Sequence, residues 1–112
     1  MRAERLRHTK DIEIVRESGE MSSDPHFTMR ARRNGLASVR LAVSSPRSLG
    51  TAVRRSRARR RVREAVRAFL RERGSAPGTD LLVVARAPAV DAPFGHLRDA
   101  IARRLDAVLE PA

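Results

Sequence analysis

The first apolar pattern along the chain has the period of a helix. Ile12 and Val15 are spaced as on one face of a short helix over residues 11–18. Thr9 is placed to cap the start of this helix, and Gly19 stands where a glycine would end it. The polar Ser-Ser-Asp-Pro stretch that follows is expected to break the chain.

Apolar and polar residues then alternate, which is the period of a half-buried strand. Residues 27–32 and 39–44 both show this alternation. Asn34-Gly35 lies between them and is a strong sequence signal for a tight turn. The pattern therefore predicts a hairpin of two strands.

The second half of the chain begins with the longest helical pattern, over residues 51–73. One face of it is apolar, at Ala58, Val62, Ala65, Val66, Phe69 and Leu70. Residues 81–85 form a continuous apolar run, which predicts a strand buried on both faces. Pro88 and Pro93 are expected to bracket a loop. A C-terminal amphipathic helix follows, with apolar positions at Leu97, Ile101, Leu105, Val108 and Leu109.

This order of elements, α-β-β-α-β-α, predicts the α+β class. A length of 112 residues suits a single domain over residues 1–112, with helices packed on a small sheet. Cysteine is absent, which excludes disulfides and thiolate metal sites. The sequence has no apolar run long enough to span a membrane and no secretory signal at its N-terminus, so a cytoplasmic location is expected.

The charge of the chain narrows the class of partner. Lys and Arg number 24 against 13 Asp and Glu, a formal net charge of +11. Such an excess indicates a polyanionic partner: nucleic acid, an anionic membrane surface or an acidic protein. Lys10 is the only lysine. Arginine suits phosphate and base contacts and so favours nucleic acid, although a GC-rich genome would also enrich arginine.

The positive charge is concentrated in the long predicted helix. Residues 54–73 hold ten arginines, opposed by Glu64 and Glu72 alone. Like charges four residues apart destabilise an isolated helix, so an anionic partner or packing of the apolar face must offset them. A merely solubilising face would mix in more acids, and a membrane-surface helix would have a stronger apolar face than this alanine-rich one.

The sequence shows no catalytic constellation. His8, His26 and His96 lie in separate segments without the spacing of metal ligands. Residues 48–51 lack the flanking pattern of a phosphate-binding loop. The acidic residues have no spacing that marks a catalytic pair, so no catalytic residue and no metal site is expected in this chain.

Residues 50–64 read Gly-Thr-Ala-Val-Arg-Arg-Ser-Arg-Ala-Arg-Arg-Arg-Val-Arg-Glu. This stretch resembles the signature of the bacterial ribonuclease P protein, roughly G-x-A-V-x-R-N-R-x-[KR]-R-x-x-R-E at the start of a long helix. Ser56 stands where the family usually has Asn. The matching residues are Arg55, Arg57, Arg59, Arg60, Arg63 and Glu64.

Three further stretches extend the resemblance over almost the whole chain. Arg5-Leu6 and residues 11–19 resemble the family's N-terminal pattern, with Ile12 in place of the usual Phe. Residues 39–44 resemble the strand before the signature, although Arg40 occupies a position that is usually Gly. Residues 78–86 resemble the family's G-x-D-x-V-[VI]-[VI]-A-R strand.

The resemblance implies a more specific fold than the periodicity does. The family order is α-β-β-(β)-α-β-α, a fold like that of the second domain of ribosomal protein S5. In it, the long helix joins two parallel strands by a left-handed βαβ crossover. General rules strongly favour the right-handed connection, so the expected hand comes from the resemblance only.

The resemblance also implies a function as the protein subunit of ribonuclease P. Such a subunit binds the catalytic RNA and the 5′ leader of precursor tRNA, and it assists Mg²⁺-dependent cleavage by ions held mainly by the RNA. No membrane partner or small-molecule substrate is expected. The residues expected to bind the catalytic RNA are Arg54, Arg55, Ser56, Arg57, Arg59, Arg60, Arg63 and Arg67. Those expected to line a leader-binding cleft between the long helix and the sheet are Ile12, Val15, Phe27, Arg40 and Arg47.

Two residues of the signature helix have other expected roles. Arg61 falls at a variable position and is expected to add charge only. Glu64 is expected either to pair with a neighbouring arginine or to contact RNA or a metal ion. Two alternative functions stay open: a ribosomal or other structural RNA-binding protein, and a DNA-binding module. The first would show no preference for tRNA precursors that carry leaders, and the second would bind duplex DNA at least as well as RNA.

Overall fold

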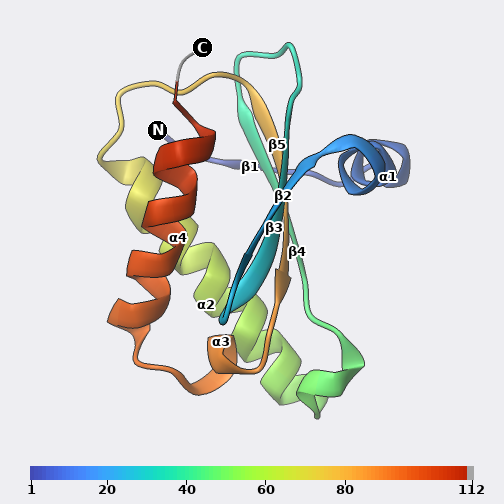
Figure 1. Cartoon of the computed structure of the whole chain (residues 1–112), viewed down its shortest axis with the longest axis vertical. Coiled ribbons are helices and arrows are strands. Elements are labelled where there is room, and N and C mark those ends of the chain that lie inside the picture. Colours follow the sequence, from blue (N-terminus) through green and yellow to red (C-terminus); the bar gives the residue numbers. More distant parts are fainter. Residues whose placement is uncertain (111–112) are drawn as a thin grey trace.

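A computed structural model describes residues 1–110 of the chain. Five strands form one mixed sheet in the order β1-β4-β5-β3-β2, with α2 and α4 on one face and α1 on the other (Figure 1). The strands are β1 (Glu4–Arg5), β2 (Glu20–Asp24), β3 (Phe27–Arg33), β4 (Val39–Ser44) and β5 (Thr79–Ala85). The helices are α1 (Thr9–Ser18), α2 (Ala52–Arg71), α3 (Pro88–Asp91) and α4 (Phe94–Val108), with a 3-10 turn η1 (Arg47–Leu49) before α2.

Strand β5 occupies the centre of the sheet. It pairs in parallel with β4 and antiparallel with β3. Its side chains are buried on both faces, as the apolar run predicts, and an edge position would have exposed them. The predicted hairpin is therefore wrong, because β5 lies between β3 and β4. Gly35 does adopt a left-handed conformation, with φ of 71°, within the loop that joins these two strands.

The main core lies between the sheet and α2, α3 and α4. Met29, Leu41, Leu81 and Val83 point from the sheet into this core. The predicted apolar face of α2 is confirmed, with Phe69 partly buried at its edge and the other five residues fully buried. Each fully buried side chain of Val or Leu size contributes about 1.5–3 kcal/mol, so this layer supplies most of the hydrophobic stabilisation.

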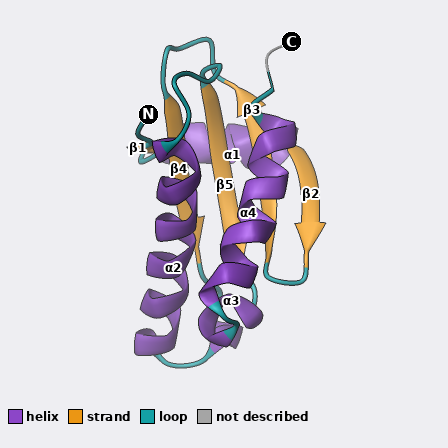
Figure 2. Ribbon diagram, turned by 90° about the vertical axis from the view of Figure 1, so that its left-hand side faces the viewer, coloured by secondary structure: helices purple, strands orange, loops and turns teal. Residues whose placement is uncertain are grey.

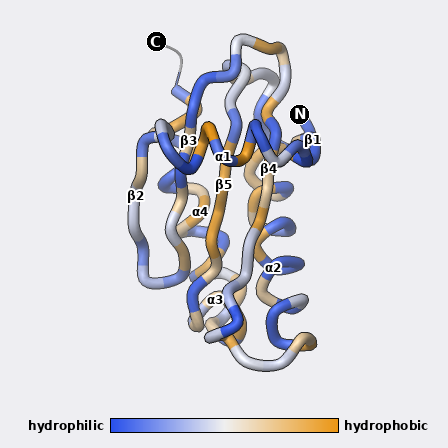
Figure 3. The backbone as a smooth tube through the Cα atoms, turned by 90° about the vertical axis from the view of Figure 1, so that its right-hand side faces the viewer, coloured by the Kyte–Doolittle hydropathy of each residue, from blue (hydrophilic) through white to orange (hydrophobic). Residues whose placement is uncertain are grey.

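The opposite face of the sheet carries a smaller cluster beneath α1. Leu6, Val15 and Leu82 are buried there, with Ile12 packed against them. Figure 3 shows that α1 crosses the upper part of this face, while no helix covers the lower parts of β3, β4 and β5. The sheet thus has one fully covered face and one partly open face.

The connection from β4 through α2 to β5 has the unusual hand. Figure 2 views the sheet from the side of α2, with β4 and β5 running downward and β5 to the right of β4. That arrangement is a left-handed crossover, as the family resemblance implies and against the general rule. The crossover places the whole length of α2 along the β4 side of the sheet.

Besides the 3-10 turn η1, two elements were not predicted: β1, a two-residue strand parallel to β4, and α3, which occupies the expected loop. The edge strand β2, antiparallel to β3, is the additional strand in the order that the resemblance implies. The polar stretch around Ser22 was expected to break the chain, but it lies within β2. A polar sequence can form this strand because an edge strand needs no apolar face.

The ends of α1 also differ from the sequence prediction. The helix begins at Thr9, its N-cap is His8, and no side chain caps it. Gly19 has an extended φ of −72° rather than a left-handed one. A glycine is needed there for space, because a Cβ atom would lie 2.4 Å from the carbonyl oxygen of Val15.

Candidate nucleic-acid interface

The basic helix α2 starts at a defined cap. Gly50 precedes it in a conformation with φ of 110°, which favours glycine. The Oγ1 of Thr51 accepts a hydrogen bond from the backbone N–H of Arg54 at 3.2 Å. The cap fixes the phase of the helix from its first turn, so the arginines of the signature point in defined directions.

One set of arginines on α2 holds the short helix α3. The Nε of Arg57 donates to the carbonyl oxygen of Val90 at 2.9 Å, and Arg54 lies 3.3 Å from the carboxylate of Asp91. Arg61 donates to the carbonyl oxygens of Ala89 and Ala92. These carbonyls lie at and beyond the end of α3, where helix carbonyls lack partners within the helix.

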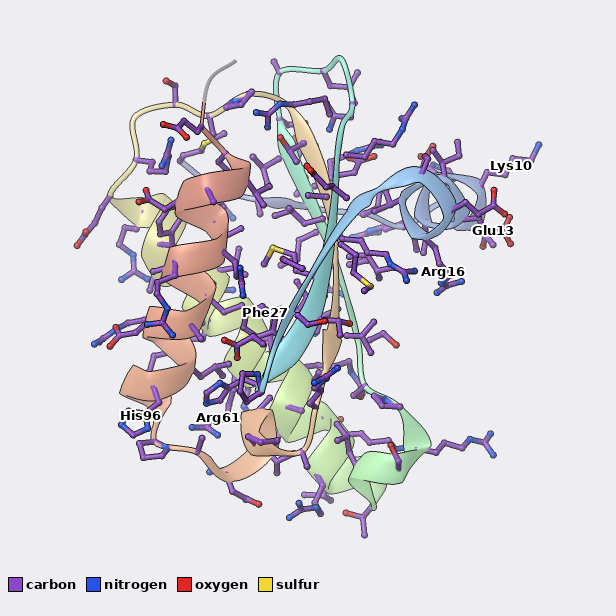
Figure 4. All side chains as sticks on the ribbon, viewed as in Figure 1. Lys10, Glu13, Arg16, Phe27, Arg61 and His96 are labelled. Carbon is purple, nitrogen blue, oxygen red and sulfur yellow. The ribbon has the colours of Figure 1, made fainter. Side chains whose placement is uncertain are left out.

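Arg61 is therefore a structural residue, and the prediction that it only adds charge is wrong. Its side chain reaches into the lower part of the molecule in Figure 4. Burial, reinforced by the nearby positive charge of Arg57, lowers the pKa of the Arg61 guanidinium. The surrounding carbonyls supply the hydrogen bonds that such a half-buried cation requires.

A second set of arginines faces away from α3 and forms what we call the outer basic surface. It is a shallow groove on α2 that Arg5 of β1 completes. Its lining residues are Arg5, Ser56, Arg59, Arg60, Arg63, Glu64 and Arg67. Five of these seven residues are arginines, and the one acid, Glu64, accepts a hydrogen bond from Arg67 at 2.6 Å. The expected pairing of Glu64 with a neighbouring arginine is thus confirmed.

Arg63 is the centre of this surface. Burial lowers the pKa of its guanidinium, and the positive charges of Arg5 and Arg59 lower it further. Arg59 is oriented by two serines, donating to Ser45 Oγ at 2.6 Å and to Ser56 Oγ at 3.1 Å. A cluster of cations that repel one another is stabilised when an anion binds between them.

Arg5 is the residue of this surface that the sequence prediction missed. The backbone N–H of Leu6 donates to the carbonyl oxygen of Leu41 at 2.9 Å, and the buried Leu6 side chain anchors the segment. This pairing with β4 brings Arg5 next to Arg63. A two-residue strand is too short to show a period, so no sequence signal placed Arg5 beside α2.

Three of the predicted RNA-binding residues, Arg54, Arg55 and Arg57, do not line the outer basic surface. Arg54 and Arg57 hold α3 but keep part of their guanidinium groups exposed. The Nε of Arg55 is buried and has no hydrogen-bond partner within residues 1–110. The structure thus divides the arginines of the predicted helix by what they contact.

The five residues predicted to line a leader cleft do not lie together. Phe27 and Val15 are fully buried, and they lie on opposite faces of the sheet. Figure 4 shows Phe27 between β3 and the α2/α4 layer. Arg47 lies in η1, beyond the end of β4. Ile12 lines a shallow groove that also reaches Leu41 of β4 and Arg63 of α2, but the other four residues do not line it. The predicted five-residue cleft is therefore wrong.

The partly open face of the sheet offers a different surface. Half-buried side chains lie there beside α1, at Thr28, Ala42, Ser44 and Val84. Ile12 borders it from α1. Arg40 lies on the same face, but its guanidinium is bound to Asp80, as described below.

Two negative findings apply to the described part of the chain. Residues 1–110 contain no group of three or more His, Cys, Asp or Glu side chains placed to hold a metal ion. None of the helices in that range is both long and apolar enough to cross a membrane.

The sequence and fold match one group of known proteins. The family model for ribonuclease P matches residues 1–108. A ribonuclease P protein component from Chloroflexus aggregans is 42% identical over 105 residues, which cover 93% of this chain and 76% of the relative. One from Herpetosiphon aurantiacus is 35% identical over 104 residues, covering 93% and 83% of the two chains.

Solved structures agree with these sequence matches. The ribonuclease P protein of Thermotoga maritima superposes with a TM-score of 0.74 at 27% identity, covering 97% of this chain and 98% of that one. The Staphylococcus aureus protein gives a TM-score of 0.78 at 23% identity, covering 97% and 100%, which supports the shared fold.

Proposed function

This chain belongs to the ribonuclease P protein family, and from that premise we propose that it binds two RNA partners on two different surfaces. The outer basic surface of α2 and β1 binds the catalytic RNA of ribonuclease P. The partly open face of the sheet beside α1 binds the 5′ leader of precursor tRNA. The chain thereby assists removal of the leader to give the mature 5′ end of the tRNA.

The single observation that carries the first assignment is the groove around Arg63. It presents five arginines and one already paired acid to the solvent. A hydrogen bond between a guanidinium and a phosphate is charge-assisted and contributes about 1.5–3 kcal/mol. Burial and mutual repulsion disfavour the charged form of Arg63 in the free protein, and the negative charge of a bound phosphate would offset this cost.

The second assignment rests on the shape and polarity of the open sheet face. Its strands run side by side without a covering helix, and their side chains there are small or polar (Figure 3). Ile12 supplies an apolar border but no aromatic ring on which a base could stack. We therefore expect the leader to be held through its phosphates by Arg30 of β3 and by Arg86, which follows β5, rather than by stacking.

The Mg²⁺ ions of the reaction are assigned to the RNA. The outer basic surface repels cations, whereas RNA phosphates attract them. Bound Mg²⁺ would activate the attacking water and stabilise the leaving oxygen. The arginines of this chain lower the repulsion between catalytic RNA and substrate, and the sheet face positions the leader.

The salt dependence of binding tests the phosphate contacts. Replacing Arg63→Ala should weaken binding of the catalytic RNA and reduce the slope of log K against log salt by about one. Arg98→Ala is the matched control, because Arg98 is an exposed arginine of α4 outside the outer basic surface. Filter binding at several salt concentrations measures both slopes, and equal slopes for the two variants would contradict the assignment.

Binding specificity separates this function from its alternatives. We expect tighter binding to catalytic ribonuclease P RNA than to a ribosomal RNA fragment or to duplex DNA of equal length at physiological salt. A structural RNA-binding protein would bind the ribosomal fragment as well, and a DNA-binding module would prefer the duplex. Competition titrations with labelled catalytic RNA distinguish the three outcomes.

A further inference from the structure

Helix α1 is attached to the sheet by few contacts. Its apolar attachment is the small cluster of Leu6, Val15 and Leu82. At its C-terminal end, Arg30 Nη1 donates to the carbonyl oxygen of Arg16 at 2.9 Å. At its N-terminal end, Asp11 Oδ2 lies 3.5 Å from Arg40 Nη1. The angle of α1 on the sheet thus depends strongly on what holds its two ends.

The contact at the N-terminal end belongs to a rigid network. Arg40 donates to both carboxylate oxygens of Asp80, from Nε and Nη2, at 2.7 Å each. Asn34 Nδ2 donates to Asp80 Oδ1 at 2.8 Å, and its Oδ1 accepts from the N–H of Leu36. The Asp80 side chain is only 5% exposed. A bidentate pair of this kind fixes the plane of the guanidinium, so the remaining Nη1 points in a set direction.

This geometry changes the role of Arg40. The sequence prediction made it a cationic contact for the leader, but its donors are directed at Asp80 and Asp11. The hydrogen bond and charge of Asp80 raise the pKa of the guanidinium, so it stays charged. The resemblance places glycine at this position in most of the family, and a glycine has no side chain with which to form this network.

We propose that Arg40, held by Asp80, is a positioning residue that orients α1 through Asp11 and thereby sets the width of the leader-binding face. This inference rests on the proposed function, because it assigns the geometry of the same leader surface. The ion pair joins α1 directly to the two central parallel strands, since Arg40 and Asp80 are register partners on β4 and β5. Loss of the Asp11 contact would free the N-terminal end of α1 while leaving the Arg40–Asp80 pair intact.

The test variant is Asp11→Asn, because removing Arg40 or Asp80 would leave the charge of the other residue without its main partner and strongly destabilise the fold. Glu13→Gln is the matched control: it removes the same charge from an exposed position of α1, and Figure 4 shows Glu13 pointing away from the sheet. Both variants make the protein more positive. Bulk electrostatics therefore predicts equal or tighter RNA binding for both, which is opposite to the effect of losing the contact.

Two readouts are measured for wild type and variants. The first is a ratio of two affinities of the assembled holoenzyme: its affinity for precursor tRNA with a leader, divided by its affinity for tRNA without one. Any effect of a variant on binding of the catalytic RNA is common to both affinities and cancels in the ratio. The second is hydrogen exchange of the α1 amides in the free protein. We expect Asp11→Asn to lower the ratio about threefold, because a partly exposed ion pair makes only a small contribution to the free energy. We also expect it to speed hydrogen exchange of the α1 amides. Glu13→Gln should change neither, and Asp11→Glu should restore both.

If Asp11→Asn behaves as Glu13→Gln does in both readouts, the positioning role is refuted while the proposed function stands. A wild-type ratio of one would instead refute the leader surface and, with it, the effect of Arg40 on leader binding. In that case the exchange rates still decide whether Asp11 holds α1.

Discussion

Replacing Arg59 and Arg63 together by alanine should weaken binding of the catalytic RNA by about 100-fold at physiological salt. Two charge-assisted hydrogen bonds to phosphate are lost, at about 1.5 kcal/mol each, and each 1.4 kcal/mol is a factor of ten. The fold should survive, because within residues 1–110 the side-chain hydrogen bonds of Arg59 go to two serine hydroxyls, those of Ser45 and Ser56, and the Arg63 side chain forms none. Equilibrium binding to the catalytic RNA, with circular dichroism as a check of folding, measures the effect.

The control for this pair is Arg98→Ala with Arg103→Ala. It removes the same charge from exposed positions of α4, away from the outer basic surface. This control should weaken binding only slightly, through the lower net charge. Equal losses in the two double variants would show that overall charge, and not this surface, binds the RNA. Arg57 is less suitable for the test, because its Nε also holds α3.

The second large effect is on stability, at Gly78. A Cβ atom at this position would lie 1.9 Å from the carbonyl oxygen of Leu36 and 2.5 Å from Asn34 Oδ1. The loop between β3 and β4 passes directly over Gly78, whose own carbonyl accepts from the N–H of Asn34 at 3.1 Å. Gly78→Ala must therefore displace backbone, and we expect it to lower the free energy of unfolding by about 3 kcal/mol.

Gly74→Ala provides the comparison for Gly78→Ala. A Cβ atom on Gly74 would meet no atom within 4 Å, so this variant should be neutral or stabilising by about 0.4–1 kcal/mol. Urea denaturation followed by circular dichroism gives both values. Similar midpoints for the two variants would mean that the β3–β4 loop does not pack on Gly78 as described.

The sequence predicted best where one periodic pattern extended over many residues. The apolar face of α2 and the doubly buried β5 were both confirmed. Their apolar residues predict burial whichever elements pack against them. The hairpin failed for the opposite reason. Asn34-Gly35 signals a local turn, but the pairing of β3 and β4 competes with their pairing to β5, which lies much later in the chain. Turn signals carry no information about such distant strands.

From the sequence, the candidate site could be narrowed to one basic helix but not to individual side chains. The number of arginines in α2 showed that the helix is basic. Which of these arginines are free to bind RNA depends on hydrogen-bond acceptors that lie far away in the sequence. Arg57 and Arg61 contact carbonyls of α3, some 30 residues away in sequence. Phe27 was assigned to the leader cleft by the resemblance, whereas its side chain lies on the same face of β3 as Met29, in the core. Arg5 joined the site only through the short pairing of β1 with β4.

Cleavage of precursor tRNA at low Mg²⁺ by bacterial ribonuclease P RNA, with and without this protein, tests the central claim most directly. The proposed function predicts that the protein restores cleavage at the mature 5′ end, and that the variant lacking Arg59 and Arg63 does not at the same concentration. RNA binding without any gain in cleavage, using the catalytic RNA of the same organism, would contradict it.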